Sequence, residues 1–226
     1  LPAGPEKLFE DACRMFIAIT REVGGHNKKL WQALAETQQQ EMAMVVKMYT
    51  SAANQGHAGA QCNLGGLYFD GKGVGQDFNE AVKWYHKAAS QGNVTAQFYL
   101  GVELEHGKRV AQDLEEAVRW YCKAADQGDA AAQVNLGAMY ESGKGVAQDL
   151  KEAVRWYFKA ADQGAASAQV NLGIMHKSGK GVDQDFIKAA QWYLKAADQG
   201  HAKGQVGLGV VYSNGEGVVQ DHKKAV

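Results

Sequence analysis

The stretch from Ala153 to Gly164 reads AVRWYFKAADQG, and close copies of it recur along the chain every 36 residues. The interval is marked by four tryptophans, five aspartates and five Gln-Gly pairs: Trp84, Trp120, Trp156 and Trp192; Asp77, Asp113, Asp149, Asp185 and Asp221; and 55–56, 91–92, 127–128, 163–164 and 199–200. A period of this length is typical of a solenoid, in which each repeat buries its apolar face by stacking on its neighbours. The sequence therefore predicts an array of repeats, and it favours binding over catalysis.

The copy at 129–164 indicates that each repeat begins with a helix. Its first half carries apolar side chains at steps of three and four residues, which is the spacing of one helix face. These side chains are Ala132, Leu136, Met139 and Tyr140. Gly143 and Gly145 follow shortly after them. Because glycine adopts left-handed dihedral angles at little cost, this pair predicts the end of the helix and a loop.

A second helix is predicted in the other half of the same repeat. Asp149 suits an N-cap position, and Glu152 stands three residues later, in the arrangement of a capping box. Apolar residues and small alanines then continue to Gly164, which marks the end of this helix. Each repeat is therefore expected to form an antiparallel pair, helix A followed by helix B, with alanines where the helices approach closely.

This pattern resembles the Sel1-like repeat family, which is related to the tetratricopeptide repeats. Three motifs carry the resemblance: Ala-Gln-x-Asn-Leu-Gly-x-x-Tyr at 132–140, Gly-Lys-Gly-Val-x-Gln-Asp at 143–149 and Ala-Val-x-Trp-Tyr-x-Lys-Ala-Ala at 153–161. The resemblance implies an all-α fold, a right-handed α-solenoid of antiparallel helix pairs. It also implies a non-catalytic scaffold or adaptor for protein–protein interaction, with a protein or peptide as partner, no cofactor and no catalytic residue.

The repeat motifs divide the chain into an N-terminal helical capping segment, 1–40, and a repeat solenoid, 41–226. The solenoid comprises a half-repeat at 41–56, complete repeats one to four at 57–92, 93–128, 129–164 and 165–200, and a partial repeat five at 201–226. Because the sequence stops early in the second helix of repeat five, we expect an exposed apolar end that favours self-association.

Residues 1–40 do not match the repeat. Their apolar spacing predicts an amphipathic helix that begins near Pro5, a favoured first helical residue, and ends at Gly24 and Gly25. Helical spacing then continues without a breaking residue from Asn27 to Asn54, which predicts one long helix leading into the first repeat. The segment is expected to cap the open end of the stack. A docking or dimerisation arm is the alternative.

Repeat two departs most from the pattern. Tyr99 stands where its neighbours have asparagine, and Glu103 and Leu104 replace an apolar residue and a tyrosine. Arg109 replaces the second loop glycine. Since left-handed dihedral angles cost a residue with a side chain about 1 kcal/mol, we expect a strained or rearranged loop and a gain of stability in Arg109→Gly. The departures reflect either drift or a feature specific to a partner.

The composition bears on several function classes. The 24 basic and 25 acidic residues leave a net charge of −1, which provides no electrostatic footprint for nucleic acid. No apolar run approaches the roughly 20 residues that span a bilayer, and residues 1–9 lack the pattern of a signal peptide. Cys13, Cys62 and Cys122 are odd in number and occupy unrelated repeat positions, which argues against a disulfide framework. The sequence has no CxxC pair and its histidines are scattered, which argues against a zinc site. We expect no membrane insertion, and the compartment stays open.

In the related tetratricopeptide solenoids, helix A lines the concave surface, which is where a partner is expected to bind. Alignment of the repeats on the Leu-Gly-x-x-Tyr core places six candidate side chains there: Asn63, Phe98, Tyr99, Asn135, Asn171 and Lys203. An asparagine amide both donates and accepts hydrogen bonds, so it can hold a peptide backbone. The sequence thus predicts a protein segment lying along these residues. The alternative is that the asparagines bond only to neighbouring helices or loops.

Two other functions remain open. One is a structural subunit of a larger assembly, which would contact other chains through its N-terminal helices and its C-terminal end; a large apolar patch at those ends would favour it. The other is a small hydrolase, which would need perturbed titratable residues that converge in one pocket. The aspartates at the repeat interval are spread along the array, and an N-cap role is sufficient to explain them.

Overall fold

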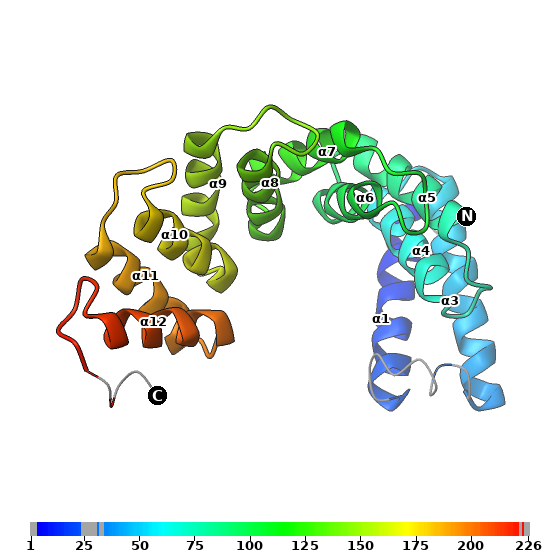
Figure 1. The fold of residues 1–226 in the computed structure, drawn as a ribbon. Coiled ribbons are helices and arrows are strands. Elements are labelled where there is room, and N and C mark those ends of the chain that lie inside the picture. Colours follow the sequence, from blue (N-terminus) through cyan, green and yellow to red (C-terminus); the bar gives the residue numbers. More distant parts are fainter. Residues whose placement is uncertain (1–3, 24–30, 32–33, 222, 224–226) are drawn as a thin grey trace. The chain divides into compact units, whose positions relative to one another are not determined.

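A computed structural model describes residues 4–23, 31, 34–221 and 223, and within these residues it contains helices and no strand (Figure 1). The helices are α1 Pro5–Val23, α3 Glu36–Asn54, α4 Ala58–Asp70, α5 Phe78–Ser90, α6 Val94–His106, α7 Leu114–Asp126, α8 Ala130–Ser142, α9 Leu150–Asp162, α10 Ala166–Ser178, α11 Phe186–Asp198 and α12 Ala202–Asn214. The even-numbered members from α4 to α12 are the predicted A helices, and the odd-numbered members from α3 to α11 are the B helices. The all-α helical-repeat fold is therefore confirmed.

The helix ends form as the local sequence predicts. In repeat three, the Asp149 carboxylate accepts hydrogen bonds from the backbone N–H groups of Lys151 and Glu152, both at 3.0 Å. Gly143 ends α8 with a φ of 70°, and Gly164 follows α9 with a φ of 87°. Both angles lie in the left-handed region that glycine tolerates best, so these positions end the two helices for a conformational reason.

The chain divides into two compact bodies, with the boundary between Gln112 and Asp113. In the N-terminal body, α1 packs on α3, α3 on α4, α4 on α5 and α5 on α6. One apolar core runs through this stack and includes the fully buried side chains of Ile19, Val45 and Leu64. Helix α1 thus shares a core with the first repeats, while its role as a cap stays a prediction.

The C-terminal body is a stack of the six helices from α7 to α12, in which each helix packs on the next. The repeated glycine of helix A sets the distance between paired helices. A Cβ atom added to Gly137 would lie 2.6 Å from the Tyr157 ring, and one added to Gly173 would lie 2.6 Å from the Tyr193 ring. Close approach of helix B therefore explains why glycine recurs at this position.

Buried glutamines also tie successive repeats together. The side-chain amide of Gln133 donates a hydrogen bond to the Ala125 carbonyl oxygen at 3.0 Å, and its own side-chain oxygen accepts one from Gln163 at 2.9 Å. The same arrangement links Gln199 to Gln169. Because these buried amides are satisfied by partners in specific positions, they fix the register of neighbouring helix pairs.

The predicted long helix over Asn27 to Asn54 is wrong. Leu34 and Ala35 are not helical, and α3 begins only at Glu36. Ala35 occupies the N-cap position with φ −59° and ψ 155°, and its backbone N–H donates a hydrogen bond to the Gln38 side chain at 3.2 Å. Residues 24–30 and 32–33 of the predicted helix lie outside the described residues, as does the end of repeat five at 222 and 224–226.

The predicted backbone strain at Arg109 is also wrong. Gly73, Gly145, Gly181 and Gly217 do have positive φ angles, but no described residue other than glycine has one. Arg109 instead places its guanidinium group 3.1 Å from the buried Glu103 carboxylate and over the rings of Phe69 and Phe78, at 4.7 and 5.0 Å. The loop is therefore rearranged around a new ion pair.

Candidate protein-binding site

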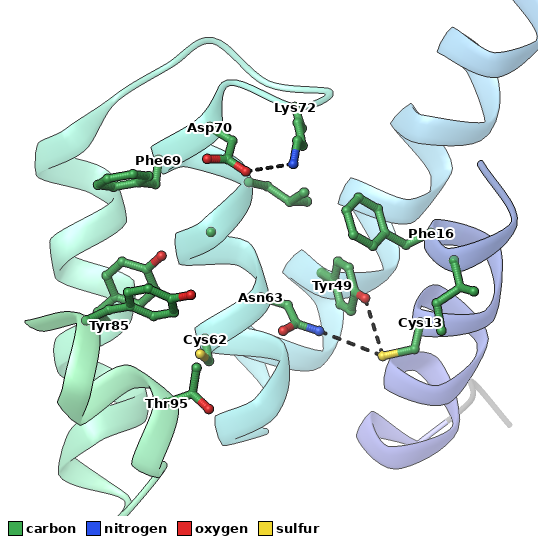
Figure 2. A pocket seen from close by; sticks show the side chains of 14 residues that line it. Cys13, Phe16, Tyr49, Cys62, Asn63, Phe69, Asp70, Lys72, Tyr85 and Thr95 are labelled. Carbon is green, nitrogen blue, oxygen red and sulfur yellow. Dashed lines mark hydrogen bonds and ion pairs between the residues drawn. The ribbon is translucent and has the colours of Figure 1, made fainter. Parts of the chain in front are cut away.

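A pocket of about 500 Å³ opens on the A helices of the N-terminal body (Figure 2). Helices α1, α3, α4, α5 and α6 all contribute to its wall. The residues that line it are Cys13, Phe16, Ile17, Tyr49, Cys62, Asn63, Gly66, Leu67, Phe69, Asp70, Lys72, Tyr85, Thr95 and Tyr99. Most of these side chains are apolar or aromatic, and a few polar groups stand among them, which is the usual make-up of a binding pocket.

One wall of the pocket is held by a small hydrogen-bond cluster around Cys13. The Tyr49 hydroxyl donates to the Cys13 sulfur at 3.3 Å, and the Asn63 side-chain amide donates to the same sulfur at 3.7 Å (Figure 2). Burial, followed by the bond to Cys13, raises the pKa of Tyr49. The cluster joins α1, α3 and α4, so it positions α1 against the first repeat.

A second cluster closes the opposite end of the pocket. The Lys72 ammonium group lies 2.7 Å from the Asp70 carboxylate and 5.2 Å from the centre of the Trp31 ring. Lys72 is almost fully buried, whereas the Asp70 side chain is 46% exposed. Because the two charges cancel, this end of the pocket has no net charge to offer a ligand.

The third wall is formed by Cys62 on α4 and by two stacked tyrosines. Burial raises the pKa of the Cys62 thiol to about 11, so the thiol is neutral at physiological pH. Tyr85 on α5 and Tyr99 on α6 stack with ring centres 5.6 Å apart. Burial is also the largest cause of the raised pKa of Tyr85, whose side chain faces the same space as Cys62 and Asn63 (Figure 2).

The structure brings together only some of the six predicted contact residues. Asn63 and Tyr99 line the pocket, and the Phe98 ring packs against Tyr99 with ring centres 5.6 Å apart. The other three lie in the C-terminal body. Asn135 donates a hydrogen bond to the Tyr121 hydroxyl at 3.1 Å, Asn171 lies beside the Tyr157 hydroxyl, and Lys203 is exposed at the start of α12.

In three places an asparagine stands 14 residues after a helix-B tyrosine. Asn63 lies beside Tyr49, Asn135 bonds to Tyr121 and Asn171 lies beside Tyr157, each on the A helix that follows. Asn63 and Asn135 therefore do bond to neighbouring helices, which was the alternative to peptide binding. Each amide keeps further donor and acceptor capacity, so the two roles are compatible.

Sequence reasoning missed the contribution of α1 and the role of Gly66. Cys13, Phe16 and Ile17 reach the pocket only because α1 folds back on α3 and α4, and no repeat motif predicts that contact. The repeat alignment does single out Gly66. The matching positions of the later repeats are Val102, Ala138, Ile174 and Val210, so repeat one alone has glycine there.

The described residues contain no group of three or more His, Cys, Asp or Glu side chains suited to a metal ion. In the same part of the chain, no helix is both long and apolar enough to cross a membrane.

Comparison with known proteins identifies the family. The Sel1 repeat model matches at 46–57, 58–93, 94–129, 130–164, 166–201 and 202–226, which together make up most of the chain. The chain belongs to the Sel1 repeat family. Proteins of this family are generally non-catalytic scaffolds for protein interaction. No match was found among curated proteins.

Two solved structures show the same fold over nearly the whole chain. One is a protective antigen of uropathogenic Escherichia coli with an SLR fold, at 36% identity and a TM-score of 0.79 over 92% of this chain. The other is a Sel1 repeat protein from Oxalobacter formigenes, at 32% identity and a TM-score of 0.78 over 89% of this chain. This chain spans 46% of the length of the first protein and 79% of the second.

Proposed function

We propose that this chain is a non-catalytic scaffold that binds a protein segment through exposed side chains of its A helices, which are α4 and α6 in the N-terminal body and α8, α10 and α12 in the C-terminal body. The pocket at α4 and α6 is the observation that carries the proposal. It is apolar, it is open to the surface, and exposed aromatic and aliphatic side chains stand at its edge. Tyr99 is 45% exposed and Ile17 is 49% exposed. Apolar pockets of this kind hold the few residues that dominate binding at protein interfaces.

All six predicted contact residues lie on A helices. Asn63, Phe98 and Tyr99 lie at or beside the pocket, while Asn135, Asn171 and Lys203 occupy A helices of the C-terminal body. The three asparagines are half-buried, and each side-chain amide keeps donor and acceptor capacity for a backbone contact. Net charge near zero and the exposed apolar side chains favour a partner segment that is itself mostly uncharged.

Selection of a phage-displayed random peptide library on the immobilised chain tests the proposal. We expect enriched peptides to lose about tenfold in affinity when Tyr99→Ala removes the exposed ring on α6. Met44→Ala is the matched control, because Met44 is 56% exposed on the B helix α3 of the same body. Binding that survives Tyr99→Ala and is lost in Met44→Ala would place the interaction on the helix-B face and overturn the proposal.

A further inference from the structure

We infer that the pocket in the N-terminal body is an anchor site for one aromatic side chain with a neutral polar tip, tyrosine or tryptophan, presented by the bound protein segment. The inference rests on the proposed scaffold function and adds the chemistry of the occupant. Three residues that line this pocket differ from the residues at the matching positions of other repeats. They are Cys62 and Gly66 on α4 and Tyr99 on α6.

Gly66 opens the pocket. Glycine inside a helix is unfavourable relative to alanine, so its presence calls for a reason. At the adjacent Gly65 the reason is steric, because an added Cβ would lie 2.8 Å from the Tyr85 ring. At Gly66 the nearest atom to an added Cβ is the Tyr85 hydroxyl oxygen, at 3.7 Å, which is ordinary contact. No neighbour therefore requires this glycine, and what it provides is space.

Tyr99 leaves a hydrogen-bonding group unused in that space. The residue 14 positions after Tyr85 is Tyr99 rather than the asparagine of the neighbouring repeats, and its ring stacks on Tyr85. Tyr85 is only 3% exposed, and none of the hydrogen bonds found among the described residues involves its hydroxyl. The Tyr85 hydroxyl is open to the pocket, so it is a donor and acceptor for a ligand group.

The remaining polar groups exclude a charged occupant. Asp70 and Lys72 neutralise each other, and the high pKa of Cys62 keeps its thiol neutral. A carboxylate or ammonium group buried here would lack a counter-charge, which is costly. Phe16, Tyr49 and Leu67 supply apolar and aromatic surface. A volume of about 500 Å³ is ample for one large side chain and part of its backbone. The pocket therefore suits an occupant that is both apolar over most of its surface and uncharged at its polar end. Tyrosine and tryptophan have both properties, because each joins a flat apolar ring to one neutral polar group.

The test uses N-acetyl-tyrosinamide and N-acetyl-phenylalaninamide as probes, with the backbone amide signals of Gly66 and Thr95 in the ¹⁵N-labelled chain as readout. We expect N-acetyl-tyrosinamide to shift both signals with a dissociation constant of about 1 mM. It should bind about fivefold more tightly than the phenylalanine probe, since only its ring carries a hydroxyl that can bond to Tyr85 from within the pocket. In Tyr85→Phe the two probes should bind alike.

Gly66→Val restores the kind of residue that the later repeats carry and fills the pocket. We expect it to weaken binding of N-acetyl-tyrosinamide by at least about tenfold while the chain melts at or above the wild-type temperature. Ala138→Val makes a similar change at the matching, exposed position of α8 and should leave the affinity unchanged.

Three results would overturn the anchor site: no shift of the Gly66 signal, equal binding of the two probes to the wild type, or tight binding that survives Gly66→Val. Library peptides that bind the wild type and Gly66→Val alike would also overturn it, and would leave the scaffold function standing. Probe binding with no peptide selected would support the pocket and count against the scaffold function, so the two failures are distinguishable.

Discussion

At the scale of single residues, Arg109 and Glu103 show how one departure from the repeat requires another. Glu103 is 5% exposed at a position where Leu67 and Met139 are buried in other repeats. A carboxylate there needs a partner, and Arg109 supplies it from the loop at 3.1 Å while its flat guanidinium group covers two phenylalanine rings. The pair therefore substitutes for an apolar contact and a loop glycine together.

Arg109→Gly should therefore destabilise the chain, opposite to the expectation from the glycine pattern alone. Removing the guanidinium group leaves a buried carboxylate unpaired, and we expect a loss of about 1–3 kcal/mol in the free energy of unfolding by urea. The double variant Glu103→Met, Arg109→Gly recreates the combination of Met139 and Gly145 in repeat three and should recover most of the loss. A single variant as stable as the wild type would show that the ion pair is not needed.

At the scale of the helices, the recurring tryptophan of helix B is predicted to be the main contact between pairs. Trp156 is 4% exposed, and the Lys159 ammonium group lies 3.9 Å from its ring centre. Trp156→Ala should cost about 3–5 kcal/mol in urea unfolding. Trp192 stands at the same position of α11 but is only half-buried, so Trp192→Ala should cost clearly less. A Trp156→Ala curve that overlays the wild type would contradict the packing argument.

The ends of the helices were predictable where capping residues and glycines mark them in the sequence. Caps such as Asp149 and stops such as Gly143 act on their own neighbours, so the repeat pattern was enough to place them. The start of α3 was missed because Ala35 is a residue with no strong signal for a helix end. The pocket was only partly predictable for a different reason. Asn63 and Tyr99 follow from the repeat alignment, whereas Phe16 arrives through the tertiary contact of a helix that has no counterpart in the repeats.

At the scale of the whole molecule, a stack of repeats should respond to damage unevenly, because each helix pair is stabilised mainly by its nearest neighbours. The Trp156→Ala change removes packing in α9, which contacts α8 and α10 within the C-terminal body. In native-state hydrogen exchange, we expect the amides of α8, α9 and α10 to lose the most protection. Those of α1, α3 and α4, which share the separate core of the N-terminal body, should lose the least. The shift of the Gly66 signal by N-acetyl-tyrosinamide should persist in this variant. A uniform loss of protection from α1 to α12 would instead show that the two bodies unfold as one cooperative unit, and that repeats distant from Trp156 depend on it as strongly as its neighbours do.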